Sequence, residues 1–263
     1  MLPVESTEAE PARTRAEALA ANLAAVHARI DAAAQAPRAP GISVVAPQLI
    51  VVTKFHPAVD VRTLHGLGVR DVGENRCQEA SAKAAELADA APALRWHFIG
   101  QLQTNKAKSV AAYAHAVHSV DRPALVSALS RAVVAEQEAT GRAELGVFLQ
   151  MSLEDAAPQA SGAAPAGAAR GGADPAALLE LAGLVEAAQG LRLRGLMAVA
   201  PLGADPDAAF ERLAELSATL VAAFPGAGEL SAGMSGDLEA AVRWGATHLR
   251  VGSDVLGPRP TVR

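Results

Sequence analysis

The chain has 263 residues, of which 51% are hydrophobic and only 3% aromatic, so Ala, Val and Leu must fill its core in place of aromatic rings. Its 23 basic and 28 acidic side chains give a net charge of −5, which excludes a general role at nucleic acid or at an anionic membrane surface. A single cysteine excludes an intramolecular disulfide framework, and the lack of a long apolar run or secretory segment predicts a cytoplasmic protein with no membrane span.

Eight short apolar or β-branched runs alternate with Ala/Leu-rich helical segments along the chain. A helix over about 14–35 comes first, and the predicted strands follow at residues 49–54, 69–74, 94–100, 114–120, 144–152, 191–199, 228–235 and 246–253. Helices are predicted between them at about 57–67, 76–90, 104–112, 122–140, 174–189, 205–223 and 235–244. Eight strand–helix units in a chain of roughly this length predict a (β/α)8 TIM barrel with an extra N-terminal helix.

An open doubly wound sheet would show the same alternation, but it normally has fewer strands and a glycine-rich phosphate turn after the first one. Here the first strand runs into TKFHP at residues 53–57, so the closed barrel is favoured. Residues 13–263 are predicted to form this single barrel, preceded by a frayed tail over residues 1–12. Residues 154–174 are Ala/Gly/Pro/Ser-rich and of low complexity, which predicts a mobile loop.

Functional groups in such a barrel lie at the carboxyl ends of the strands and in the loops that follow them. Lys54 ends the first predicted strand, whereas the other three lysines of the chain fall in predicted helices. Partial desolvation at the barrel mouth would favour the neutral amine of Lys54, which is the form that attacks an aldehyde carbon. The alternative is a lysine that simply extends to solvent from a strand end.

The last two strands end in SAGMSGD and LRVGSD, the places where barrels usually bind phosphate. Ser235 is predicted to cap the next helix, whose amides could receive an anion. Gly252 would allow a close backbone approach, while Arg250 and Ser253 would supply a charge and a hydroxyl. Each segment alone could also be an ordinary strand-to-helix turn.

Four other residues, Asn75, His115, His118 and Cys77, could also carry chemistry. Asn75 follows the second strand and could donate to the phenolic oxygen of a ring cofactor, or cap a helix. His115 and His118 have a metal-like spacing, but alternation along a strand predicts that they face opposite sides, so no metal site is predicted. Cys77 has no evident catalytic partner and is expected to pack in a helix.

Several motifs together resemble a known family, in the right order from about residue 15 to 257: VVTKFHP, VGENRCQE, WHFIGQLQTNKAK, HSVD, GLMAVAP and LSAGMSGDLEAAVRWGATHLRVGSDVLG. They are similar to the YggS/PROSC family, the pyridoxal phosphate homeostasis proteins. The resemblance implies an alanine racemase N-terminal-domain-like barrel that holds pyridoxal 5′-phosphate (PLP) as a Schiff base on Lys54. It also implies a role in intracellular vitamin B6 and amino-acid homeostasis without efficient catalysis.

The resemblance carries further roles over by position. It places Asn75 beside the cofactor ring. The residues expected around the phosphate, together with the methionine between them, are Ser231, Met234, Ser235, Arg250, Gly252 and Ser253. The residues expected to line the rest of the pocket are His97, Ser119 and Met197. The sequence departs from the usual family pattern at Ala232 and Ser253, which keep the backbone and hydroxyl groups expected at the phosphate. It also departs at Phe55 and His56, which leaves the outer environment of the ring open.

Three functions remain open from the sequence. The first is a PLP carrier or regulator, with amino acids and PLP-dependent apoenzymes as candidate partners, and a monomer because no extra dimerising domain is evident. The second is a PLP-dependent amino-acid racemase or decarboxylase of the same barrel class. Those enzymes add a domain that supplies a second acid–base group, and the single tyrosine here, Tyr113, is predicted at the far end of the barrel. The third is an enzyme for a phosphorylated metabolite, with Lys54 in an ion pair.

Overall fold

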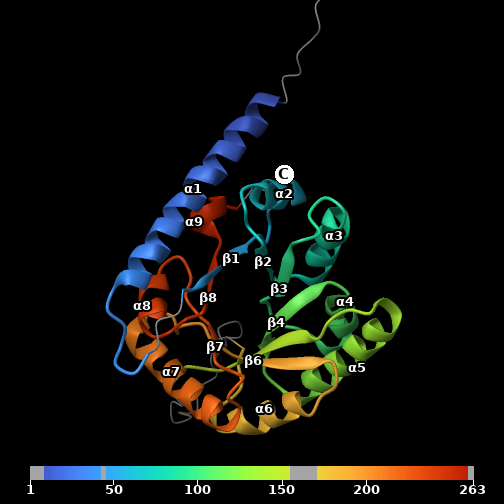
Figure 1. The fold of residues 1–263 in the computed structure, drawn as a ribbon, viewed down its shortest axis with the longest axis vertical. Coiled ribbons are helices and arrows are strands. Elements are labelled where there is room, and N and C mark those ends of the chain that lie inside the picture. Colours follow the sequence, from blue (N-terminus) through green and yellow to red (C-terminus); the bar gives the residue numbers. More distant parts are fainter. Residues whose placement is uncertain (1–8, 43–45, 155–170, 260–263) are drawn as a thin grey trace, which may run out of the picture.

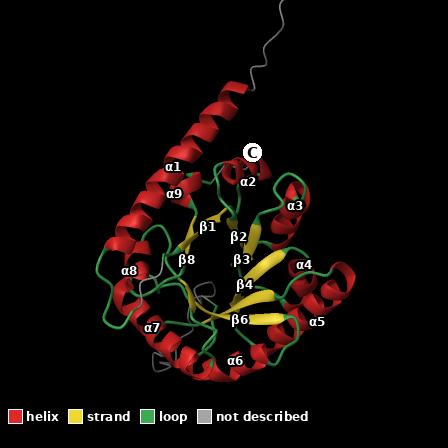
Figure 2. Cartoon of the chain, in the orientation of Figure 1, coloured by secondary structure: helices red, strands yellow, loops and turns green. Residues whose placement is uncertain are grey.

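The computed structural model describes residues 9–42, 46–154 and 171–259, which form a closed barrel of eight parallel strands (Figure 1). Each strand pairs with its neighbours in chain order, and β8 (His248–Val251) closes the sheet against β1 (Gln48–Val52). The predicted TIM barrel is therefore confirmed. Figure 2 shows the strands in the centre and the helices around them, because parallel strands must be joined by crossover connections.

The strands between these two are β2 (Asp71–Glu74), β3 (Arg95–Phe98), β4 (Ala114–Val120), β5 (Leu145–Gln150), β6 (Leu191–Met197) and β7 (Glu229–Ser231). The helices are α1 (Ala9–Gln35), α2 (Ala58–Gly66), α3 (Cys77–Leu87), η1 (Thr104–Lys106), α4 (Ala107–Ala111), α5 (Pro123–Thr140), η2 (Pro175–Ala177), α6 (Leu178–Glu186), α7 (Pro206–Ala223), α8 (Leu238–Arg243) and α9 (Ser253–Leu256). Six strands end two to four residues earlier than predicted, and only β2 and β4 end where expected. After β1 and β7 the chain soon turns through left-handed backbone, at Phe55 (φ 69°) and at Gly233 (φ 87°). The residues concerned lie in loops at the barrel mouth instead.

The N-terminal helix α1 ties down two of these loops. It begins at Ala9, so the last residues of the predicted frayed tail are helical, and residues 1–8 lie outside the described residues. In Figure 1 it runs past α8 and α9, with its first turns beyond the barrel. Arg29 donates to the carbonyl of Ser235 (3.0 Å) and to the carboxylate of Asp254 (2.7 Å). These contacts hold the loops after β7 and β8 from outside.

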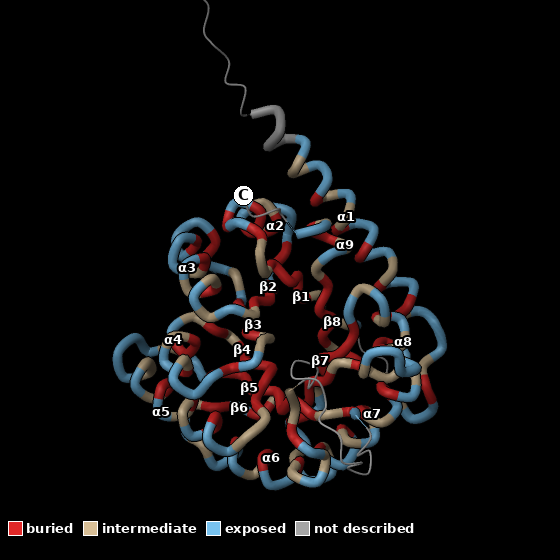
Figure 3. The backbone as a smooth tube through the Cα atoms, turned by 180° about the vertical axis from the view of Figure 1, so that it is seen from behind, coloured by how far each residue is buried: buried red, intermediate tan, exposed pale blue. Residues whose placement is uncertain are grey.

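The core has two apolar clusters. The larger lies between barrel and helices and consists mainly of Leu, Val and Ala, as the composition predicts. The smaller consists of Ala116, Phe148 and Met197, whose chain neighbours belong to the larger cluster, so these three face the barrel interior. Polar side chains fill much of the remaining interior, including the buried His118 and Arg250. Figure 3 shows the buried strands at the centre and the exposed outer surfaces of the helices.

Most of the predicted mobile loop, residues 155–170, lies outside the described residues. Its C-terminal end is anchored, because Ala173 forms a parallel bridge with Met151 and donates from its N–H to the carbonyl of Gln150 (2.8 Å). Ala173 is also buried. Within the described ranges, no helix is both long and apolar enough to cross a bilayer.

Candidate functional site

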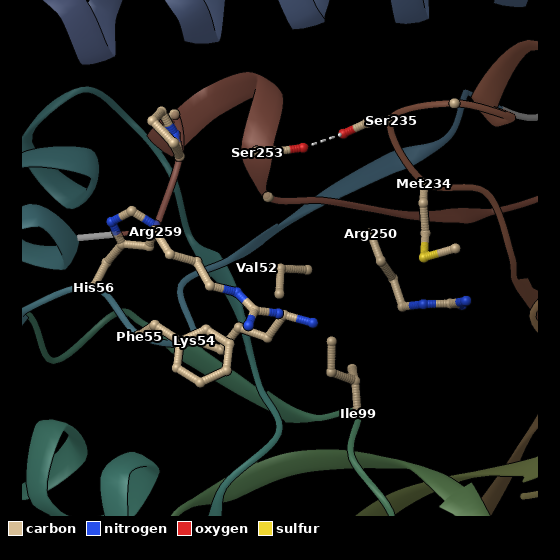
Figure 4. Close-up of a pocket in the computed structure, with 14 residues that line it drawn as sticks. Val52, Lys54, Phe55, His56, Ile99, Met234, Ser235, Arg250, Ser253 and Arg259 are labelled. Carbon is tan, nitrogen blue, oxygen red and sulfur yellow. Dashed lines mark hydrogen bonds between the residues drawn. The ribbon is translucent and has the colours of Figure 1, made fainter. Parts of the chain in front are cut away.

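A cavity of about 370 Å³ lies at the carboxyl ends of β1 and β8, a size suited to a small cofactor. The predicted cofactor residues that line it are Lys54, Met234, Ser235, Arg250, Gly252 and Ser253 (Figure 4). They come from three loops and one inward-facing strand position. The barrel therefore brings together about half of the residues that were predicted to bind the cofactor.

One end of the cavity presents hydroxyl groups. The Oγ atoms of Ser235 and Ser253 lie 3.2 Å apart; Ser235 is half-buried and Ser253 is exposed. The prediction that Ser235 caps α8 is wrong, since Asp237 occupies the cap position. Gly252 precedes α9, and a Cβ there would lie 3.1 Å from the carbonyl oxygen of Val52. Only a glycine fits this close approach without displacing β1.

Arg250 forms the other polar end of the cavity. Its side chain is buried, and it donates to Ser231 Oγ (2.7 Å) and to the carbonyl of Ala198 (2.9 Å). Neither partner is a carboxylate, and burial lowers its pKa to about 10. In Figure 4 the guanidinium points away from Ser235 and Ser253. Arg250 is therefore a buried cation open to an electron-rich ligand, separate from the hydroxyl end.

Lys54 lies just beyond the end of β1, on the cavity wall. Burial lowers the pKa of its amine, and the nearby Arg259 lowers it further by charge repulsion, while Glu74 acts in the opposite direction. These effects increase the fraction of neutral amine, as the sequence predicts for a nucleophilic lysine. The sequence analysis assigned no role to Arg259, because this residue follows the last motif of the family resemblance.

The turn that presents Lys54 is held by a second lysine. Phe55 follows in left-handed backbone that non-glycine residues rarely adopt, and its N–H donates to Glu79 Oε1 (2.7 Å). Lys83 Nζ contacts that same oxygen (2.7 Å), Glu74 Oε1 (2.7 Å) and the carbonyl of Thr53 (2.9 Å). Lys83 is only 6% exposed. Sequence reasoning set it aside as a helical lysine, although its spacing from Glu79 suggested a helical ion pair.

Two arginines flank the ring of Phe55 at the cavity mouth. The guanidinium carbons of Arg76 and Arg259 lie 4.6 Å and 4.2 Å from the ring centroid. Such contacts are favourable cation–π interactions. Phe55 thereby places Arg259 over the cavity next to Lys54 (Figure 4).

Asn75 and Cys77 line a neighbouring cavity of about 650 Å³ instead. The Oδ1 atom of Asn75 is buried and accepts no hydrogen bond among the described residues. The helix-cap alternative for Asn75 is wrong, because Arg76 holds the cap position of α3. Cys77 is half-buried at the start of that helix.

The remaining predicted residues lie inside the barrel and do not line the main cavity: His97, Ser119, Met197 and Ser231. All four are at most 2% exposed. The prediction that His115 and His118 face opposite sides is wrong, since their rings lie 5.6 Å and 5.1 Å from that of His97. The pairing of β4 shifts register against both neighbouring strands, which breaks the regular alternation of its side chains.

Tyr113, the only tyrosine, is not part of the cavity. Its ring packs edge-on against Trp96, with centroids 6.5 Å apart. Its hydroxyl is buried, and this burial raises the pKa well above the usual tyrosine range. Tyr113 directly precedes β4, which agrees with the prediction that it lies at the far end of the barrel.

Comparisons with known proteins show the family of this chain. The sequence profile of the alanine racemase N-terminal domain matches residues 16–260. A "Pyridoxal phosphate homeostasis protein" of Mycobacterium tuberculosis is 45% identical over 249 residues, covering 90% of this chain and 91% of that protein. A protein of the same name in Pseudomonas aeruginosa is 42% identical over 244 residues, covering 92% and 96%.

Solved structures show the same fold. PipY of Synechococcus elongatus, solved with PLP bound, has a TM-score of 0.71 and 37% identity, and the match covers 91% of this chain and 100% of that chain. An alanine racemase from Corynebacterium glutamicum, at 14% identity and a TM-score of 0.62, shares the fold, and 62% of its length is matched. The chain belongs to the pyridoxal phosphate homeostasis protein family, which is built on the alanine racemase N-terminal domain.

Proposed function

We propose that this protein binds PLP in the cavity at the ends of β1 and β8, as a Schiff base on Lys54. We propose further that it acts as a monomeric, intracellular carrier or regulator in vitamin B6 and amino-acid homeostasis. The observation that carries the proposal is a partly desolvated lysine amine in one cavity with a buried, carboxylate-free guanidinium, Arg250. The names of the relatives, and the PLP bound to PipY, support the choice of ligand.

The residues of the cavity fit the parts of this cofactor. With PLP bound, the neutral amine of Lys54 would form the C–N bond to the aldehyde carbon, and the aldehyde oxygen would leave as water. We assign the phosphate to the hydroxyl end, where Ser235, Ser253 and the backbone at Gly252 can donate to it. Bound PLP supplies an electron-withdrawing ring.

Arg250 is assigned to the opposite end of the ligand, because its guanidinium points away from the two serines. This assignment replaces the sequence-based expectation that Arg250 holds the phosphate directly. A guanidinium only donates hydrogen bonds, so the atom of the ligand that faces Arg250 must be an acceptor. Asn75 and the interior residues His97, Ser119 and Met197 then support the site from behind or beside it.

The side chains in the cavity that can exchange protons favour a carrier over an efficient racemase. Racemisation needs a proton carrier on each face of the substrate carbon. Among the described cavity residues, the side chains of the lysine and histidine type are Lys54 and His56, and the pKa of His56 is lowered by burial. Both come from the same turn between β1 and α2, so they do not supply one proton carrier to each face. Neither Tyr113 nor Cys77 lines the cavity. Amino acids are therefore proposed as ligands that turn over slowly.

The test is chemical labelling of the purified protein. We expect a yellow protein and, after borohydride reduction, the cofactor mass on the peptide that contains Lys54. Lys54→Ala should abolish the label, whereas Lys108→Ala, a change at an exposed lysine on α4, should leave it unchanged. A label that remains in Lys54→Ala, or protein that stays colourless with added PLP, would overturn the proposal.

A further inference from the structure

A continuous row of buried hydrogen bonds crosses the barrel from the cavity to its opposite face. Arg250 Nη1 lies 2.7 Å from Ser231 Oγ, which lies 2.8 Å from His118 Nδ1. His118 Nε2 lies 2.9 Å from His97 Nδ1, and His97 Nε2 lies 2.9 Å from Asp71 Oδ1. All five residues are at most 5% exposed. The row joins five strands, from the carboxyl ends of β7 and β8 to the first residue of β2.

The two ends of the row, together with neutral histidine rings, fix the direction of every hydrogen bond in it. A guanidinium can only donate, so Ser231 Oγ must accept from Arg250. An ionised carboxylate can only accept, so Asp71 must receive a hydrogen from His97. His97 then accepts at Nδ1 from His118, which in turn accepts at Nδ1 from the hydroxyl of Ser231. One order of protons satisfies all four contacts.

The surroundings keep the two histidines neutral and the aspartate charged. Burial lowers the pKa of both His97 and His118 below the usual histidine range. Burial acts to raise the pKa of Asp71, but hydrogen bonds from His97 and Arg95 outweigh it and hold this pKa well below its usual range. The ring of His118 also stacks on Phe148, with centroids 4.2 Å apart, which fixes its orientation.

We propose that Asp71, His97, His118 and Ser231 form a positioning relay that holds the guanidinium of Arg250 toward the cavity. A serine hydroxyl rotates freely unless its hydrogen has an acceptor. Because His118 Nδ1 takes that hydrogen, the lone pairs of Ser231 are left to face Arg250. Asp71 thus sets, through two histidines, how an arginine on the far side of the barrel is held.

The order of protons can be tested without cofactor. Nitrogen NMR of the histidine-labelled protein at neutral pH distinguishes the two neutral tautomers from the imidazolium. We expect His97 and His118 to be neutral, with the proton on Nε2, and we expect Asp71→Leu, which removes the final acceptor, to abolish this single order. An imidazolium or an Nδ1–H tautomer at either histidine in the unmodified protein would overturn the relay.

The effect on Arg250 is tested by a double-mutant cycle, which rests on the proposed function because PLP affinity is the readout. Ser231→Ala should weaken PLP binding roughly ten- to a hundredfold, the range for a hydrogen bond to a charged group. His118→Phe should cause a similar loss alone but none in the Ser231→Ala background. His115→Phe is the control, because His115 packs on His97 without joining the relay.

Failure of the relay and failure of the proposed PLP binding give different results. Losses that simply add would mean that His118 acts by packing, and unchanged affinity in both single variants would show that Arg250 needs no support; either overturns the relay. If His118→Phe does not fold, as judged by circular dichroism, His97→Phe replaces it and must show the same lack of additivity. Protein that binds no PLP would refute the proposed function, while the tautomers of His97 and His118 would still decide the relay.

Discussion

Replacing Lys83 by Met should destabilise the fold, because Lys83 is buried in an ion pair, although it does not line the cavity. The ammonium contacts Glu74, Glu79 and the carbonyl of Thr53, and Glu74 is only 1% exposed. Removing one partner of a buried ion pair leaves an uncompensated charge, which costs about 3–5 kcal/mol. For a chain of this size, roughly 2–4 °C of melting temperature is lost per kcal/mol, so we expect a fall of about 6–20 °C.

The assay is thermal unfolding followed by circular dichroism, with Lys108→Met as the matched control at an exposed position. Burial raises the pKa of Glu74, and Lys83 opposes that effect. Without Lys83 this pKa rises further, so the folded state binds a proton more tightly than the unfolded state does. Stability of Lys83→Met should therefore increase as the pH falls through the raised pKa of Glu74 toward the ordinary pKa of glutamate, which is the sign that linkage requires.

Glu74→Gln combined with Lys83→Met should recover part of the loss, because it removes the unpaired charge. Equal melting temperatures for Lys83→Met and Lys108→Met would show that the Glu74, Glu79 and Lys83 cluster does not stabilise the turn after β1. A loss that does not change with pH would show that Glu74 is not the group left uncompensated.

Three further predictions concern the cavity. Arg250→Ala should weaken PLP binding roughly ten- to a hundredfold in a spectroscopic titration, since it removes a charge-assisted hydrogen bond; equal affinity would place the ligand elsewhere. Arg259→Gln removes a charge that lowers the pKa of Lys54, so Schiff-base formation, followed by absorbance, should shift to higher pH; an unchanged profile would refute this role. Single enantiomers of alanine incubated with the PLP-loaded protein in heavy water should racemise far below ordinary enzymatic rates, because a missing positioned acid or base costs about 10²–10⁴ in rate. Turnover on the order of 1–10³ per second would favour the racemase alternative.

The pattern of residues along the chain was enough to predict the barrel and the location of its mouth. Eight alternating units leave few other topologies, and parallel strands in a closed barrel bring all their carboxyl ends to one face. Lys54, Ser235, Gly252 and Ser253 could therefore be placed near one another from three separate stretches of sequence. Their convergence follows from topology alone, which is why it survived errors of several residues in the strand ends.

The tertiary structure alone decided which polar side chains pair inside the barrel. Ser231 and His118 are 113 residues apart, and Lys83 reaches back 30 residues to Thr53. No local spacing encodes such contacts, because a buried polar group takes its partner from whichever strand faces it. The register shifts of β4, which bring His115 and His118 to the same neighbour, likewise depend on pairing with β3 and β5. Periodicity in the sequence thus determined which elements form, while closure of the barrel determined how Arg250 and the histidines behind it are held.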